Sequence, residues 1–388
     1  MNLVDVLFFQ AEIAPDKLAL VAHGSVVPYR KLVYGILSAE QRLAAIGVTA
    51  GQTVAISVAH PIDHLAFACA LYRLKAASAS IAHATDAYLD HVPFDLVLSD
   101  GFLPAFSVKQ PSAKFHLVDP SWFLDQVAFD VSQRASSRRD SSPDWTARVT
   151  CYPESGHQPI VVKTTSRVLE EQLMSYCISA PPSWDRMISV AGIHTSTGFV
   201  QTLSALWLGR SVCLADVATA RSLSTIYKHD YLVANSEEVD PLLRLQDVNF
   251  AALSGLRAAC FEGRACRAAT IARGLATICS NLHFRYVHPQ IGIVAYGDVR
   301  RFGAVDGAVG FVAPWIEAQV VDADETPLQA RREGALRFRA RDRLLPQTTK
   351  AAPEDGKSDA TNGWIYPGQR AWLTADNLLV VASAGIAA

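Results

Sequence analysis

The sequence predicts an α/β protein with two lobes, each built on a largely parallel sheet, followed by a small antiparallel β-unit. Three observations support this fold class. Strand-like and helix-like apolar segments alternate up to about residue 300, residues 132–143 form a polar, serine-rich stretch, and the segments after residue 304 are β-rich with a period of two. We therefore expect lobes at 1–148 and 149–303 and a small β-rich unit at 304–388.

The first lobe begins with a helix over 3–13 that stops before Pro15, and a hairpin over 18–27 follows it. An amphipathic helix is predicted over 29–46, and Gly47 is a suitable residue to end it. Further elements are strands at 53–58, 77–81 and 94–98, and a helix at 65–74.

In the second lobe, β-branched and apolar runs predict strands at 187–190, 211–214 and 231–233. Helices are predicted at 167–179, 198–208 and 266–278. The end unit has strands at 309–312, 316–321 and 334–339 and a hairpin within 373–381. A long polar loop is expected at 346–362.

Composition excludes several classes of protein. Half of the 388 residues are hydrophobic and the net charge is −2, as expected of a globular protein without a basic face for nucleic acid. The seven cysteines form no C-x-x-C pair, which predicts reduced thiols and no metal centre. No apolar run is long enough to span a membrane. We expect a cytoplasmic protein that binds neither nucleic acid nor membrane.

The segment from Cys151 to Ile160 stands where a phosphate-binding loop is expected, between the first lobe and a helix. Such a loop needs several glycines, hydroxyls and a lysine, because closely spaced N–H groups and one cation neutralise the phosphates. Here Gly156 is the only glycine, Ser155 is the only aliphatic hydroxyl, and Glu154 adds a negative charge. The segment is poorly suited to phosphate.

Five segments in order carry a resemblance to a known family. They are Tyr29–Ile56 with its Gly47-Val-Thr-Ala-Gly51 turn, Ser189–Val212, Leu253–Ala265, Ala308–Leu336 and Asn362–Gln369. Together they resemble the large N-terminal domain of the AMP-dependent synthetases and ligases, which include acyl-CoA synthetases, luciferase and the adenylation domains of peptide synthetases. The resemblance covers essentially the whole chain. It implies two stacked lobes, a C-terminal β-subdomain, and the absence of the family's mobile C-terminal domain, since the chain stops near the hinge.

The resemblance also implies where ligands bind. His194 would lie beside the pocket for an acyl or aryl carboxylic acid, and Tyr286 would stack on an adenine. The implied nucleotide-binding residues are Ser155, Gly156, Gly263, Arg264, Tyr286, Gln290 and Gln369. Two of these assignments have an alternative: His194 as a packing histidine, and Gly263–Arg264 as a tight turn.

Four departures from the family pattern weaken the implied activity. Pro159 replaces the loop lysine, Pro289 replaces a threonine, Gln290 replaces the magnesium-binding glutamate, and Gln369 replaces the aspartate that grips the ribose. Losing one electrostatic stabiliser of a transition state costs about 10²–10³-fold in rate. We therefore assign no catalytic residue, expect weak binding of ATP or AMP, and leave magnesium binding in doubt.

Three functions remain open at this point. The first is a pseudoenzyme that binds a small carboxylic acid and acts as a binding or regulatory subunit. The second is an active acyl-CoA or acyl-adenylate ligase that uses non-standard residues, or a protein partner that supplies the missing domain. The third is a scaffold or interaction protein that keeps the fold alone.

Overall fold

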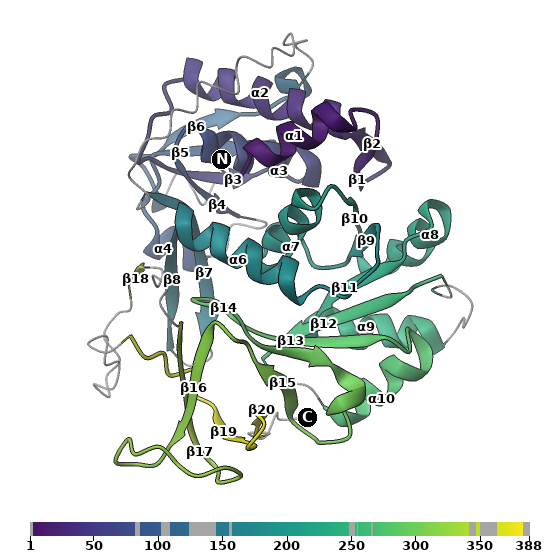
Figure 1. The fold of residues 1–388 in the computed structure, drawn as a ribbon. Coiled ribbons are helices and arrows are strands. Elements are labelled where there is room, and N and C mark those ends of the chain that lie inside the picture. Colours follow the sequence, from purple (N-terminus) through teal and green to yellow (C-terminus); the bar gives the residue numbers. More distant parts are fainter. Residues whose placement is uncertain are drawn as a thin grey trace. The chain divides into compact units, whose positions relative to one another are not determined.

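The computed structural model describes residues 3–81, 86–101, 109–123, 145–154, 157–247, 253, 255–264, 267–340, 347–349 and 363–382 (Figure 1). The chain forms two compact units that alternate along the sequence. The first comprises residues 1–174, 192–214 and 346–351, and the second comprises 175–191, 215–345 and 352–388. The expected division at residues 148 and 303 stays a prediction.

The first unit combines helices with two groups of strands. Its helices are α1 (Asp5–Ile13), α2 (Tyr29–Ala45), α3 (Pro61–Arg73), α4 (Asp86–His91) and α7 (Ser196–Trp207), with a 3-10 turn at Pro120–Phe123. Its strands are β1 (Leu18–Ala22), β2 (Ser25–Pro28), β3 (Thr53–Ser57), β4 (Ala77–Ser80), β5 (Leu96–Ser99), β6 (Lys114–Leu117), β7 (Thr146–Glu154), β8 (His157–Thr165), β10 (Ser211–Leu214) and β18 (Gln347–Thr349).

The main sheet of the first unit has the strand order β18-β8-β7-β4-β3-β5-β6. The pairs β7–β4, β4–β3, β3–β5 and β5–β6 are parallel, whereas β8 pairs antiparallel with both β7 and β18. The inner strands β3, β4 and β5 are largely buried, because both faces of a parallel sheet are covered. Ala55, Ala79, Val97 and Val149 accordingly belong to one buried cluster.

The apolar pattern of helix α2 determines which face of the helix is buried in the first unit. Leu32, Ile36 and Leu43 recur at helical spacing, and all three are buried. The Tyr29 hydroxyl, at the start of the helix, donates to the carbonyl of Leu206 at 3.0 Å. This bond ties α2 to the end of α7, a helix that the candidate site depends on.

The second unit is built on one large mixed sheet. Its helices are α8 (Val217–Tyr227), α9 (Ser236–Asp247) and α10 (Ala268–Thr277), and α6 (Ser166–Ser179) begins in the first unit and ends in the second. Its strands are β9 (Arg186–Ser189), β11 (Tyr231–Asn235), β12 (Ala258–Gly263), β13 (Leu282–His288), β14 (Gly292–Asp298), β15 (Ala308–Val312), β16 (Ile316–Val321), β17 (Gly334–Ala340), β19 (Arg370–Leu373) and β20 (Leu378–Val381).

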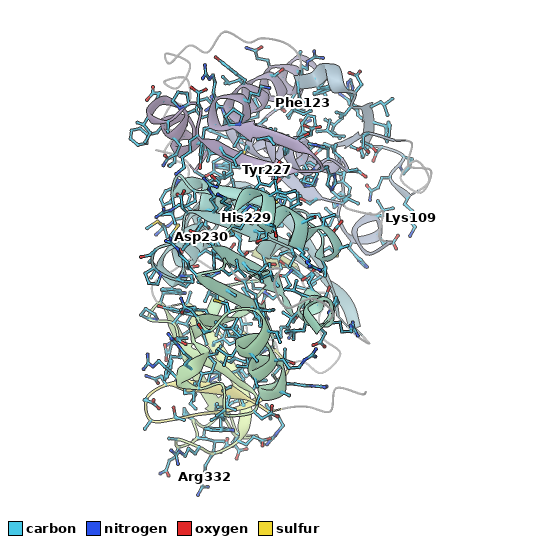
Figure 2. The ribbon with its side chains drawn as sticks, turned by 90° about the vertical axis from the view of Figure 1, so that its right-hand side faces the viewer. Lys109, Phe123, Tyr227, His229, Asp230 and Arg332 are labelled. Atoms are coloured by element: carbon cyan, nitrogen blue, oxygen red, sulfur yellow. The ribbon has the colours of Figure 1, made fainter. Side chains whose placement is uncertain are left out.

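Strands β9, β11, β12 and β13 of this sheet run parallel, and every later pairing from β13–β14 onward is antiparallel. The predicted α/β class and the antiparallel C-terminal strands are therefore confirmed. The turn between α8 and β11 leads into the parallel part of the sheet, and Figure 2 labels Tyr227, His229 and Asp230 there. There the Asp230 carboxylate accepts hydrogen bonds from the backbone N–H groups of Asp185 and Arg186.

The structure adds elements to the predicted order. Helices α8 and α9 were not expected, and β18 lies within the stretch 346–362 that was predicted as a loop. Its three residues pair with residues 161–163 of β8. The serine-rich stretch 132–143 lies outside the described residues. Within the described parts of the chain, no helix is both long and apolar enough to cross a bilayer.

Candidate functional site

The described residues of the segment that aligns with a phosphate loop lie in the paired strands β7 and β8. Strands β7 and β8 pair antiparallel up to Glu154 and His157, with Cys151 opposite Val161 and Tyr152 opposite Ile160. Main-chain groups of this segment are therefore used in a sheet ladder, which competes with a phosphate for the same donors. Ser155 and Gly156 lie outside the described residues, so their predicted roles stay predictions.

Four predicted nucleotide-binding residues come together in the second unit. Gly263 ends β12 and is paired in register with Tyr286 on β13. The Tyr286 hydroxyl donates to Oε1 of Gln369 at 2.5 Å, and Nε2 of Gln369 donates to the carbonyl oxygen of Arg264 at 3.1 Å. The Arg264 guanidinium donates in turn to the carbonyl of Pro367 at 2.9 Å. These bonds link residues 264, 286 and 367–369 into one network, which we call the Gln369 network.

Tyr286 itself is enclosed by the protein. Its exposed fraction is 0 %, and its ring meets that of Phe338 edge-on, with 6.3 Å between the ring centroids. His288, two residues further along β13, packs on the same Phe338 ring at 5.1 Å. Burial also raises the pKa of the Tyr286 hydroxyl well above its usual value. The ring expected to stack on an adenine is thus buried within the protein.

Gln290 lies in the turn between β13 and β14 and is only 9 % exposed. Its backbone N–H donates to Nδ1 of His288 at 3.4 Å. A neutral amide at this position offers Mg²⁺ no negative charge, whereas a hard cation prefers carboxylate oxygens. Among the described residues, no three histidine, cysteine, aspartate or glutamate side chains are grouped closely enough to hold a metal ion.

A buried ion pair adjoins the Gln369 network. Nη1 of Arg285 donates to Oε1 of Glu262 at 2.9 Å, and the two side chains are 3 % and 1 % exposed. The pair lies directly across β12 and β13, next to the Gly263–Tyr286 pair. It therefore holds together the two strands that carry the predicted site residues. This pair was not predicted from the sequence, because only the register of the two strands brings its members together.

In the first unit, His194 is the predicted acid-binding residue, and it lies in the turn that precedes α7. Its side chain is exposed, and its imidazole ring lies over the backbone of Gly192. Thr195 caps α7, since its Oγ1 accepts a hydrogen bond from the N–H of Gly198 at 3.0 Å. His194 is therefore presented beside the positive end of a helix.

A buried polar cluster, also missed in the sequence, lies close to His194. Nη2 of Arg148 donates to Oγ of Ser80 at 2.7 Å, and Ser80 Oγ lies 2.6 Å from Nε2 of His64. The Arg148 guanidinium also stacks on Phe199 of α7, 3.9 Å from the ring centroid. Burial, followed by the charge of Arg148, lowers the pKa of His64 to about 3, and the charge of His194 adds a smaller effect in the same direction. His64 is thus neutral, and Arg148 places a positive charge beneath α7.

At the positions predicted to bind a nucleotide, the ring of Tyr286 is buried, the side chain of Gln369 is bonded to Tyr286, and Gln290 carries a neutral amide. A triphosphate with its cation is bound best by fixed opposite charges.

No protein-family model matches this sequence, and no curated protein matches it significantly. Solved structures do match. The N-terminal domain of FACL13 from Mycobacterium tuberculosis has a TM-score of 0.80 at 14 % identity, covering 98 % of this chain and 99 % of that one. The Bacillus subtilis o-succinylbenzoate CoA synthetase in complex with the acyl-adenylate OSB-AMP has a TM-score of 0.80 at 15 % identity, covering 97 % of this chain and 77 % of that one.

The N-terminal subdomain of Klebsiella oxytoca NpsA in complex with 3-hydroxybenzoyl-AMSN has a TM-score of 0.79 at 15 % identity, covering 97 % of this chain and 98 % of that one. Identities this low establish the fold alone. The protein therefore has the fold of the N-terminal domains of adenylate-forming synthetases.

Proposed function

We propose that this protein binds a small acyl or aryl carboxylic acid in its first unit, beside His194, and that its capacity for adenylation is impaired or lost. It would then act as a binding or regulatory subunit. ATP or AMP would bind weakly, without dependence on magnesium. The proposal includes a cytoplasmic location and a protein partner that responds to the acid.

The observation that carries the proposal is the state of Tyr286. Its ring is fully buried against Phe338 and its hydroxyl is bonded to Gln369. Stacking an adenine on Tyr286 would require the packing that buries its ring to open, and binding a ribose at Gln369 would require the bond to Tyr286 to break. Both rearrangements cost free energy, and this cost weakens the observed affinity for a nucleotide. The observed free energy of binding is what remains of the contact free energy after reorganisation.

The acid-binding half of the proposal is supported by charge in the first unit. The N-terminus of α7 carries a partial positive charge, and the Arg148 cation stacks on the same helix at Phe199. A carboxylate beside His194 would lie in the field of both. The compared structures are consistent with this choice of ligand, since two of them hold an acyl-adenylate or a benzoyl analogue on the same fold.

The test has two parts. Acid-dependent exchange of pyrophosphate into ATP reports adenylation, and thermal stabilisation by a panel of acids reports acid binding. The panel should include o-succinylbenzoate and 3-hydroxybenzoate, with an active o-succinylbenzoate CoA synthetase run in parallel. We expect an acid of the panel to raise the melting temperature while exchange stays at the level of heated protein.

Each other outcome favours a different function. Acid-dependent exchange above background would contradict impairment and identify an active ligase. A melting temperature unmoved by every acid and by ATP, AMP and CoA would contradict acid binding and favour a scaffold.

A further inference from the structure

In the turn before α7, the imidazole of His194 lies where a side chain at position 192 would begin. A Cβ atom added to Gly192 would lie 2.3 Å from Cε1 of His194, 2.8 Å from Nδ1 and 2.9 Å from Nε2. Real Cβ atoms do not approach other atoms so closely. The ring of His194 therefore occupies the space that a side chain at position 192 would need.

Hydrogen bonds hold the turn in this shape. The carbonyl oxygen of Gly192 accepts from the backbone N–H of Thr195 at 2.9 Å and from the Thr195 hydroxyl at 2.8 Å. The same hydroxyl oxygen accepts from the N–H of Gly198 in the first turn of α7. Because these bonds tie the turn both to itself and to the helix, they hold the backbone that carries His194.

Gly192 is not needed for its backbone conformation. Its φ lies outside the left-handed region that favours glycine, unlike Gly209 with φ +70° in the same unit. An alanine at 192 could keep the backbone, and the three atoms nearest to its Cβ would all belong to the His194 ring. That ring belongs to an exposed side chain, so we expect the substitution to displace the ring.

We propose that Gly192 is a specificity-determining residue of the acid site: the absence of a side chain there lets His194 fold over the backbone and fixes the shape presented to the carboxylic acid. This inference rests on the proposed binding of an acid beside His194. It adds that Gly192 acts through His194 and not through any contact of its own with the acid.

The test is a double-mutant cycle with Gly192→Ala, His194→Ala and the double variant, read by calorimetric titration with the acid that binds best. Gly101→Ala is the matched control, because a Cβ there meets nothing within 4 Å and the backbone is outside the left-handed region. We expect Gly192→Ala to weaken binding by about tenfold, the size of one lost polar contact, and Gly101→Ala to leave it unchanged. In the His194→Ala background, Gly192→Ala should have no further effect.

Each result decides between the two proposals. Equal affinity for Gly192→Ala and the unmodified protein, or an equal loss with and without His194, would overturn the role of Gly192 while acid binding stands. Failure of the unmodified protein to bind any acid of the panel would overturn the proposed function and this inference with it.

Folding is a second readout of the same contact. If Gly192→Ala does not fold, a folded double variant with His194→Ala still demonstrates the steric coupling. A double variant that also fails to fold would refute it.

Discussion

The buried pair of Glu262 and Arg285 gives the sharpest test of how the second unit is held together. The perturbation is Glu262→Gln, which keeps the shape and an acceptor oxygen but removes the negative charge opposite Arg285. Both side chains are almost fully buried, so water cannot solvate the guanidinium that loses its counter-charge. The variant isolates the charge, because the size of the side chain hardly changes.

The expected magnitude follows from this burial. Removing one partner of a buried ion pair costs about 3–5 kcal/mol, compared with a total stability of about 5–15 kcal/mol for an ordinary domain. The matched control is Glu333→Gln, since Glu333 pairs with Arg370 at 2.6 Å but the two side chains are 48 % and 64 % exposed. An exposed pair contributes at most about 1 kcal/mol.

The assay is urea unfolding, monitored through tryptophan fluorescence. Trp184 packs on Tyr231, a neighbour of the ion pair, at 4.9 Å between ring centroids, and so reports on this part of the sheet. Glu262→Gln should shift the midpoint far more than Glu333→Gln at an unchanged slope. Equal, small shifts for the two variants would refute the reasoning that the pair stabilises β12 against β13.

Three further predictions concern the free energy of unfolding. Gly35→Ala in α2 should stabilise the protein by about 0.5–1 kcal/mol, because an alanine suits a helix interior and its Cβ meets Phe123, labelled in Figure 2, at an ordinary 3.8 Å; a loss on thermal or urea unfolding would contradict this. Gly310→Ala should destabilise it, since φ is +112° and the new Cβ would lie 2.6 Å from the carbonyl carbon of Tyr296, so an unchanged unfolding midpoint would be the contrary result. The buried His64 has a pKa of about 3 against 6.5 when exposed, so the unfolded chain takes up the proton first and stability falls as the pH drops from 6.5 toward 3. His64→Gln should reduce the slope of the free energy of unfolding against pH by up to about 1.4 kcal/mol per pH unit. Urea unfolding measured at several pH values over this range checks it, and an unaltered slope would be evidence against a buried neutral histidine.

Periodicity predicts most of the core elements and misses those with weak patterns. The helix predicted over 29–46 is α2, and the strand predicted at 211–214 is β10 with the same bounds. Helix α8 was missed because only Ala220 and Ser224 of it are buried, which leaves little apolar periodicity to read. Its start could have been found from Asp216, which caps the helix by accepting from the N–H of Thr219.

Motif order in the sequence proposes candidate residues, but it does not report how they are packed or bonded. Motif order alone singled out Tyr286 and Gln369, and the structure bonds these two directly although they are 83 residues apart. The burial of Tyr286 and its edge-on contact with Phe338 arise from the tertiary packing of the second unit, which no local sequence pattern reports. Likewise, a side chain at position 192 would clash with His194 because of the backbone conformation of the turn before α7. The residue types in this turn do not by themselves predict the clash.

Titration of the protein with ATP, with and without Mg²⁺, tests most directly whether the second unit is closed to nucleotides. With Tyr286 covered and Gln369 bonded inside the protein, calorimetry should give a dissociation constant above about 1 mM that does not change when Mg²⁺ is added. Micromolar binding that tightens with Mg²⁺ would contradict this view of the site.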